Sequence, residues 1–303
     1  MNIAYLISAH TDESQLKRLI DSLHPDADFF VHIDRKTDIL PFTSLIKGDN
    51  IHFIHNRIDV RWGTMIEVEY QIELIREAVR FPRRFDRIFF LSGMDYPLWS
   101  NRRITEWLEQ QGDREILQGI NMDTPLINSS QRELYSLSRP LFRAFGNTLN
   151  QKLSILCRKA LALAGHRKRL SFRVNGTEWH LYKGSAWWCI TESLARYILE
   201  CYDGIPAIKR YFTDSFGQAE TLIQTIAFNS PQWAGRCMLS EGAYPGLAAL
   251  TPLHFIIYEP VIKVMDESDY DILLNSGRMF TRKLRSGASD ALVSALTEYR
   301  KNN

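Results

Sequence analysis

The chain has 303 residues, of which 45% are hydrophobic and 24% charged, and its formal net charge at pH 7 is +2. This composition is typical of an ordinary soluble globular protein and excludes a disordered or fibrous one, and so small a net charge gives no reason to expect nucleic-acid binding. No run reaches the roughly 20 apolar residues of a transmembrane helix, so we expect a cytoplasmic protein.

Strands and helices alternate over the first 120 residues. Apolar runs of strand length occur at four places: 2–9, 28–33, 51–55 and 87–91. Apolar residues with helical spacing occur at three places: 14–23, 64–79 and 103–110. This alternation predicts an α/β fold with a mainly parallel central sheet flanked by helices. Ligands bind at the carboxyl ends of the strands in such sheets, so we expect a site in the loops SAHTDE, HIDRKTD and SGMDYP.

The second half of the chain is less regular and contains a basic stretch, residues 152–173, which starts as a helical pattern. The stretch has no acidic residue and carries seven cationic side chains: Lys152, Arg158, Lys159, Arg167, Lys168, Arg169 and Arg173. It is either a solvated helix face or a peripheral contact with the anionic inner face of a membrane, where each basic residue contributes about 1 kcal/mol.

Polar residues follow the first two strands. Asp34 ends the apolar run in VHIDRK, where its carboxylate could hydrogen-bond a ribose or a base. A turn-forming Asp that caps the strand end explains the same pattern. His10, at the end of the first strand, is in the same way either a core histidine or a ligand-binding one.

Two D-x-D triplets, 26–28 and 269–271, could in principle hold a cation on a diphosphate. The first lies in a turn before a strand, and the second opens a helix, where carboxylates suit the helix dipole. No cluster of His, Cys, Asp and Glu has zinc spacing. We therefore expect chemistry without a metal, in which Arg and Lys side chains neutralise a diphosphate.

Two charged patterns allow a structural and a functional interpretation. Arg282 and Lys283 follow an apolar pair in SGRMFTRKL and are either a solvated basic turn or a site for an anion. Glu220 begins the helical pattern of QAETLIQTIAFNSP. Its carboxylate either stabilises the helix through the helix dipole, by about 0.3 to 1 kcal/mol, or acts as a general base.

Tryptophans adjoin small residues in two places, RWG at 61–63 and GSAWW at 184–188. Glycine beside a ring of this size allows close stacking on a sugar. A tryptophan also packs readily in a hydrophobic core. The sequence leaves both interpretations open.

In this order, the motifs resemble the core-2/I-branching β-1,6-N-acetylglucosaminyltransferases and the peptide O-xylosyltransferases, one glycosyltransferase family. YLISAHTDESQLKRLI is similar to the family's first strand and helix, and FFVHIDRK to its nucleotide-contacting strand end. RWGTMIEVEYQIELIREA, FFLSGMDYPLWSN and KGSAWWCIT are similar to its W-G helix, its S-G-x-D-[YF]-P block and its G-S-x-[WY]-[WF] strand. QAETLIQTIAFNSP resembles the segment of the catalytic glutamate, and SGRMFTRKL the diphosphate site. The resemblance covers nearly the whole chain.

The resemblance implies a GT-A-type, Rossmann-like fold, a UDP-sugar donor, a glycan acceptor and an inverting single displacement without a metal. Glu220 matches the catalytic base. Lys283 and Arg282 match the diphosphate clamp, with Lys263 as a further basic candidate. Three residues match the uridine site: Ala9, His10 and Asp34. The pocket for the donor sugar and the acceptor takes four: Trp62, Asp95, Trp187 and Trp188.

The donor and the acceptor are less closely defined. Ala186 replaces the Asp of the xylosyltransferases, as in the N-acetylglucosaminyl branch, and indicates UDP-GlcNAc, whereas Arg282 is xylosyltransferase-like and keeps UDP-xylose as the alternative. We expect the acceptor, in cell-surface polysaccharide synthesis, to meet residues 121–143, with three candidates: Glu133, Tyr135 and Arg139. A non-catalytic glycan- or nucleotide-binding protein is the other alternative.

The resemblance implies one domain over residues 1–303. Residues 1–120 would form a nucleotide-binding half, and residues 121–303 an acceptor-binding and catalytic half. The family's animal members carry a membrane anchor and disulfides, and this chain shows neither signal, so it resembles a bacterial-type soluble member.

Overall fold

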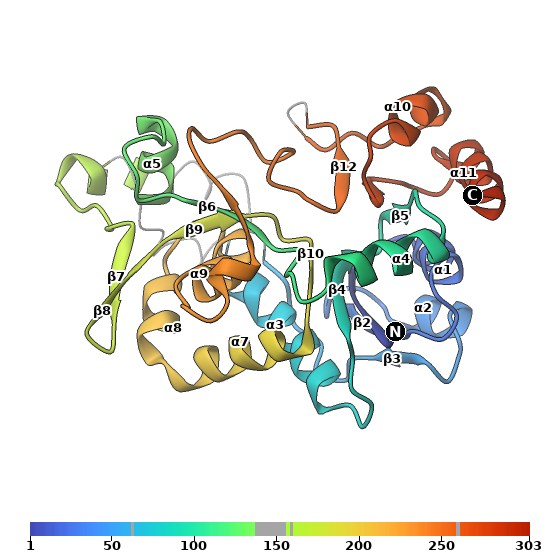
Figure 1. Ribbon diagram of the computed structural model, residues 1–303, viewed down its shortest axis with the longest axis horizontal. Coiled ribbons are helices and arrows are strands. Elements are labelled where there is room, and N and C mark those ends of the chain that lie inside the picture. The colour runs from blue at the N-terminus through green and yellow to red at the C-terminus, as the bar shows by residue number, and fades with distance from the viewer. Residues whose placement is uncertain (62–63, 137–155, 158–159, 259–260) are drawn as a thin grey trace.

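The computed structural model describes residues 1–61, 64–136, 156–157, 160–258 and 261–303. A five-stranded sheet with the order β10-β4-β1-β2-β3 organises its N-terminal part (Figure 1). Four of its strands run parallel: β1 (Ile3–Ala9), β2 (Asp28–Ile33), β3 (Ile51–Phe53) and β4 (Arg87–Ser92). The fifth strand, β10 (Trp188–Ile190), pairs antiparallel with β4. The prediction of an α/β fold with a mainly parallel sheet is therefore confirmed.

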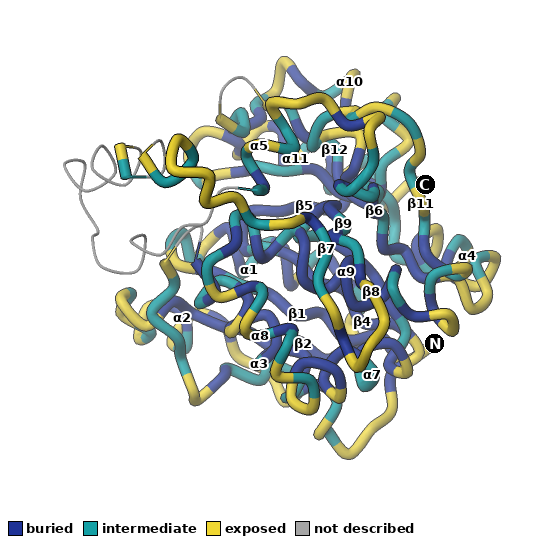
Figure 2. Tube along the Cα trace, turned by 90° about the vertical axis from the view of Figure 1, so that its left-hand side faces the viewer, coloured by how far each residue is buried: buried dark blue, intermediate teal, exposed yellow. Residues whose placement is uncertain are grey.

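Both faces of this sheet are covered, which explains why its strands are almost continuously apolar. Successive side chains of a strand point to opposite faces. Leu6 of β1 packs in a core with α3 (Ile66–Arg80), α7 (Glu192–Gly204) and α9 (Leu222–Phe228). Its neighbours Tyr5 and Ile7 pack in a second core with α1 (Glu13–Ser22) and α4 (Asn101–Gln111). Figure 2 shows β1, β2 and β4 as buried segments between these helices.

Two helices start slightly earlier than predicted, and in both a capping side chain marks the start. The helix predicted at 14–23 begins at Glu13, since the Asp12 carboxylate accepts a hydrogen bond from the Gln15 amide at 3.0 Å. The helix predicted at 103–110 begins at Asn101, since Ser100 caps it. A cap satisfies one of the amide groups that lack a partner in the first turn. The helix therefore starts at its cap and not at its first apolar residue.

The other elements form smaller sheets and short helices. Three strands surround the predicted catalytic region: β6 (Gln118–Asn121), β9 (Tyr182–Gly184) and β11 (Met238–Ser240). A hairpin contains β7 (Ser171–Val174) and β8 (Thr177–His180). The further helices are α2 (Leu40–Leu45), α5 (Ser129–Ser136), α8 (Pro206–Phe212), α10 (Tyr270–Leu274) and α11 (Asp290–Asn302), with 3-10 turns η1 (Gln218–Glu220), η2 (Ala234–Arg236) and η3 (Glu267–Asp269).

A small sheet with the strand order β12-β13-β5 corrects two expectations. SGMDYP was expected to be a loop, but Asp95–Pro97 forms β5. The basic pair was expected either in a solvated turn or at an anion site, and Arg282 ends a strand, β13 (Phe280–Arg282), between β5 and β12 (His254–Ile256). Such short strands have no periodicity of their own. They pair with segments that are distant in sequence, as Arg282 does with Asp95.

The C-terminal helices attach this small sheet to the N-terminal part of the fold. Leu273 of α10 and Leu292 of α11 share a core with Tyr96 of β5. In Figure 1 α11 lies beside α1, and Arg300 of α11 donates to the carbonyls of Trp99 and Ser22. The segment that carries Arg282 and Lys283 is thereby fixed against the end of the parallel sheet.

Candidate active site

The carboxyl ends of β1, β2 and β4 meet at one edge, as the parallel pairing requires. The Asp34 amide donates to the Ala9 carbonyl at 2.9 Å, and the Gly93 amide donates to the Ser8 carbonyl at 2.8 Å. A Cβ on Gly93 would lie only 2.8 Å from the Ala9 Cβ, so glycine is needed for this close approach. The structure therefore brings together Ala9, His10 and Asp34, the three residues predicted for the uridine site.

Within this edge, Asp34 is engaged by its own turn. Its carboxylate accepts a hydrogen bond from the Lys36 amide at 3.0 Å and pairs with the Lys36 ammonium at 3.0 Å. His10 is exposed. Partial burial lowers the pKa of His10, and the positive charges of Arg282 and Lys283 lower it further against the opposing effect of Asp34. The turn-forming interpretation of Asp34 thus holds locally, and the basic pair is close enough to act on the same edge.

Direct hydrogen bonds attach the segment after the basic pair to this edge. The Asp12 carboxylate accepts from the Ser286 amide at 2.8 Å and from its hydroxyl at 2.5 Å. The Leu284 amide donates to the Met94 carbonyl at 2.9 Å. Two of the three loops chosen from the sequence therefore hold the diphosphate-clamp candidates in place.

Asp95 anchors Arg282 and is inaccessible to a ligand. Its side chain is 0% exposed and lies within hydrogen-bonding distance of three groups: the Ser92 amide at 2.7 Å, His254 Nε2 at 3.0 Å and Arg282 Nη1 at 3.1 Å. Burial alone would raise the pKa of the Asp95 carboxyl, but His254, Arg282 and the Ser92 amide outweigh it and hold the pKa below its ordinary value. The expectation that Asp95 lines the sugar pocket is replaced by a positioning role.

Arg282 and Lys283 present positive charge at the edge of the sheet. The Arg282 side chain is 16% exposed, and its guanidinium carbon lies 5.0 Å from the centre of the Trp187 ring. Burial lowers the pKa of Lys283, and the charges of Arg282 and Arg285 lower it further. Among the described residues, no carboxylate pairs with the Lys283 ammonium. Such a group is suited to an anionic ligand.

The two adjacent tryptophans have different environments. Trp187 is partly exposed and lies between Arg282 and His254, whose ring centre is 5.4 Å away. Trp188 is 0% exposed and stacks on Phe90 at 5.3 Å. Trp187 remains a candidate for the sugar pocket, whereas Trp188 is a core residue, contrary to its predicted place in the pocket. Trp62 lies outside the described residues.

Glu220 ends the 3-10 turn η1, directly before α9. Its side chain is 31% exposed and forms an ion pair with Lys183 of β9, whose side chain is only 3% exposed. Burial alone would lower the pKa of Lys183, but the negative charge of Glu220 outweighs it and raises the pKa. A buried cation thus contacts the carboxylate that was predicted to be the general base.

A short segment connects the Glu220 region to the Arg282 region. Lys183 contacts Glu220, and Trp187, four residues further along the chain, lies over Arg282. Four residues of extended chain span at most about 14 Å between Cα atoms. One short segment, residues 183–187, therefore connects the region of the Glu220 carboxylate to the region of the basic pair.

The remaining acidic and basic candidates have other partners. The Lys263 carbonyl accepts from the Lys283 amide at 3.3 Å, but the Lys263 ammonium pairs with Asp269 at 2.7 Å. The Asp269 carboxylate also accepts from the amide of Asp266, the N-cap of η3, and Asp271 lies in the first turn of α10, in agreement with the dipole interpretation of the triplet. Asp28 starts β2, at the opposite edge of the sheet, and pairs with His52 and Arg83. In the described part of the chain, no group of three or more His, Cys, Asp or Glu could hold a metal ion.

The acceptor candidates and the basic stretch are only partly described. Glu133 pairs with the exposed Arg167 at 3.2 Å, and Tyr135 is buried next to Lys183. Arg139 lies outside the described residues, as do Lys152, Arg158 and Lys159. Lys168 points inward to Asp214, so the stretch is not uniformly solvated. Within the residues that the structure describes, none of the helices has the length and hydropathy that crossing a membrane requires.

Two residues of the site were missed in the sequence. Lys183 stands in HLYKGSAWW, and His254 in TPLHFII. Each stands directly between apolar, aromatic or glycine neighbours, and a buried charged or polar side chain needs a partner. That pattern could have indicated a buried pair, but it could not have identified Glu220 or Asp95 as the partner.

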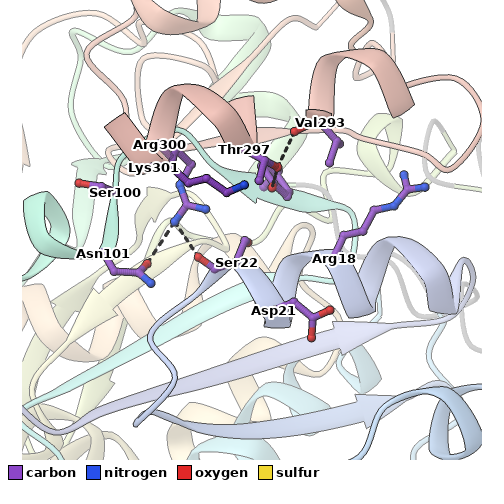
Figure 3. A pocket seen from close by; sticks show the side chains of 10 residues that line it. Arg18, Asp21, Ser22, Ser100, Asn101, Val293, Thr297, Arg300 and Lys301 are labelled. Atoms are coloured by element: carbon purple, nitrogen blue, oxygen red, sulfur yellow. Dashed lines mark hydrogen bonds between the residues drawn. The ribbon is translucent and has the colours of Figure 1, made fainter. Parts of the chain in front are cut away.

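A well-formed hollow elsewhere in the molecule has a volume of about 380 Å³ and does not include the candidate residues (Figure 3). Its lining comes from α1, the start of α4 and α11. Arg300 donates there to the Ser22 carbonyl and to Asn101. The Arg300 guanidinium is thus engaged in structural hydrogen bonds.

Comparison with known proteins gives one family and several distant relatives. A family model described as "Branch: Core-2/I-Branching enzyme" matches residues 3–244. Xylosyltransferase 2 of Homo sapiens is 25% identical over 238 residues, which are 76% of this chain and 25% of that protein. Beta-glucuronosyltransferase GlcAT14A of Arabidopsis thaliana is 23% identical over 306 residues, 93% of this chain and 61% of that protein.

The match spans about a quarter of the length of the human relative. Among solved structures, an active-site mutant of LgtC aligns with a TM-score of 0.42 and 11% identity, covering 98% of this chain and 95% of that one.

Proposed function

The chain belongs to the Core-2/I-branching enzyme family, and from this premise we propose that it is an inverting, metal-independent glycosyltransferase. It transfers a sugar from a UDP-sugar to a hydroxyl of a glycan acceptor in cell-surface polysaccharide synthesis. The observation that carries the proposal is Lys283, which pairs with no carboxylate among the described residues and follows the anchored Arg282 at the edge where three parallel strands end. Ligands of parallel α/β sheets bind at this edge.

On the donor side, Arg282 and Lys283 bind the diphosphate. Negative charge grows on the β-phosphate as the glycosidic bond breaks, and charge-assisted hydrogen bonds from fixed cations stabilise it. Asp95 holds the Arg282 guanidinium in place before the substrate arrives, so little reorganisation is needed. The two cations take the role that a divalent metal has in other diphosphate sites.

On the acceptor side, Glu220 is the general base. The acceptor hydroxyl gives its proton to the carboxylate while its oxygen attacks the anomeric carbon, and the electron pair of the broken glycosidic bond leaves with UDP. Attack from the face opposite to UDP inverts the configuration. Glu220 is partly exposed, which gives an acceptor access to it.

We infer UDP-GlcNAc as the first donor to test, because Ala186 stands where the xylosyltransferases that this chain resembles have Asp. UDP-xylose is the alternative. The relatives are named for the transfer of xylose and of glucuronic acid, so UDP-glucuronic acid belongs in the same panel.

Ligand-induced thermal stabilisation tests the donor site. In EDTA, UDP and the correct UDP-sugar at 100 times their Kd should stabilise the protein by about 2.7 kcal/mol. Lys283→Ala should abolish this shift, whereas Lys47→Ala should keep it, because Lys47 is exposed between α2 and the start of β3. Stabilisation that requires an added divalent metal would refute the metal-free mechanism.

Turnover tests the base. Glu220→Gln should lower kcat by about 10²- to 10⁴-fold while UDP still binds. A rate within about tenfold of wild type, in a folded variant, would show that Glu220 is not the base. Product formation by the wild type with any donor and acceptor pair would exclude the alternative of a non-catalytic binding protein.

A further inference from the structure

Lys183 is a buried lysine in contact with Glu220. Its ammonium pairs with Glu220 Oε2 and lies 5.4 Å from the centre of the Tyr135 ring and 6.0 Å from that of Tyr244. The side chain is 3% exposed. A charged group at this depth needs a partner, because desolvation of an unpaired ion costs several kcal/mol. The contact with Glu220 is therefore a built interaction and not a surface ion pair.

The backbone of Lys183 is fixed more firmly than that of Glu220. β9 pairs with β6, where Lys183 lies opposite Ile120 and Gly184 opposite Gly119. A Cβ on Gly184 would lie 2.0 Å from the Gln118 carbonyl oxygen, so β9 packs against β6 without space to shift. Glu220 instead ends a three-residue 3-10 turn. Of the two partners, Lys183 is the one that sets the position of the pair.

The pairing uses one oxygen of the Glu220 carboxylate. Oε2 contacts the Lys183 ammonium, and across the described residues Oε1 accepts no hydrogen bond. The Glu220 side chain is 31% exposed, whereas the Lys183 side chain is 3% exposed. An acceptor hydroxyl can therefore reach Oε1 while Oε2 is held.

We propose that Lys183 is the positioning residue for the general base: it holds Oε2 of Glu220 so that Oε1 takes the proton of the acceptor hydroxyl. The acceptor O–H bond breaks, an O–H bond forms at Oε1, and the acceptor oxygen bonds to the anomeric carbon as UDP departs with its electron pair. Lys183 keeps its own proton throughout. This inference rests on the proposed role of Glu220 as the base.

A purely structural ion pair would give different kinetics. If Lys183 acts through Glu220, its removal should reduce the chemical step and leave UDP binding intact, because the diphosphate clamp is formed by Arg282 and Lys283. It should also have no further effect once Glu220 is gone, since residues that act as a unit are non-additive. A stabilising pair without a positioning role would lower the folded fraction but not the kcat of the folded protein.

The experiment compares four variants of the full chain: Lys183→Met, Lys183→Arg, Glu220→Gln and the double variant Lys183→Met with Glu220→Gln. Lys183→Met should lower kcat by about 10- to 100-fold, the loss expected for a misplaced catalytic group, with the Kd for UDP unchanged. Lys183→Arg should restore part of the rate. The double variant should be no slower than Glu220→Gln alone.

Arg196→Met is the matched control, because it breaks the ion pair of Arg196 with Glu192 on α7, outside the site, and should leave kcat unchanged. Urea unfolding of each variant corrects the rates for the folded fraction. If Lys183→Met does not fold, Lys183→Gln, which keeps a hydrogen-bond donor, replaces it.

A wild-type kcat in folded Lys183→Met, or a double variant slower than Glu220→Gln by the full factor of the single change, would overturn the inference. These outcomes are distinct from failure of the proposed function, which would appear as a wild-type rate in Glu220→Gln itself.

Discussion

Replacing Asp95 with Asn tests whether this carboxylate anchors Arg282. The side chain is fully buried and is contacted by the Ser92 amide, His254 and Arg282 at 2.7, 3.0 and 3.1 Å. Removing one partner of a buried ion pair costs about 3 to 5 kcal/mol, because the other charge is left without compensation. At about 2 °C per kcal/mol for a chain of this size, Asp95→Asn should lower Tm by about 6 to 10 °C.

The same change should weaken the donor site. With its anchor neutral, the Arg282 guanidinium is no longer held toward the diphosphate, and the Kd for UDP should rise by about tenfold, equivalent to about 1.4 kcal/mol. The difference in unfolding free energy between wild type and Asp95→Asn should have its largest value above about pH 4. It should shrink at lower pH, because the folded-state pKa of Asp95 lies below its ordinary value and the wild type loses the contribution of the ionised carboxylate as Asp95 becomes protonated.

Urea unfolding and UDP titration measure both effects. Asp290→Asn is the control, since Asp290 forms an exposed ion pair with Arg18 at 2.6 Å and should leave stability and UDP affinity close to those of wild type. An Asp95→Asn protein with an unfolding free energy within about 1 kcal/mol of wild type, or with unchanged UDP affinity, would refute the anchoring argument.

Two further predictions concern the sheet and the tryptophans. Burial lowers the pKa of His32, which accepts a hydrogen bond from the Ile58 amide, to about 4. The free energy of unfolding should therefore have its full value above about pH 6.5 and fall by about 3 kcal/mol toward pH 4, because the unfolded chain binds a proton at His32 that the folded protein does not. His32→Gln should flatten this pH dependence in urea unfolding. Trp188→Ala should cost about 3 to 5 kcal/mol with the UDP-sugar site intact, whereas Trp187→Ala should weaken UDP-sugar binding with a smaller loss of Tm. The reverse pattern in thermal unfolding and UDP-sugar titration would contradict the core assignment.

The parallel strands were accessible to sequence reasoning because both of their faces are buried. β2 was predicted at 28–33 and has those bounds in the structure, since a run of apolar residues between turn residues identifies a buried strand without further information. The choice of the loops SAHTDE and HIDRKTD followed from the same pattern, because parallel strands end at a common edge. The selection of Ala9, His10 and Asp34 within these loops came from the family resemblance.

The short strands and the buried pairs were not accessible in this way. β5 and β13 have three residues each and pair with each other although they are far apart in the chain, with Asp95 opposite Arg282. A segment of that length has no period to detect. Asp95 was consequently placed in the sugar pocket, although its surroundings in the fold leave no surface for a sugar.

The sequence by itself determined the α/β class and the edge at which the parallel strands end, because these follow from local periodicity and residue type. Only the tertiary structure decided which charges meet. Arg282 contacts Asp95 across 187 residues of chain and Lys183 contacts Glu220 across 37. Such pairs form because burial of a charge requires a partner, and folding, not proximity in the chain, supplies it.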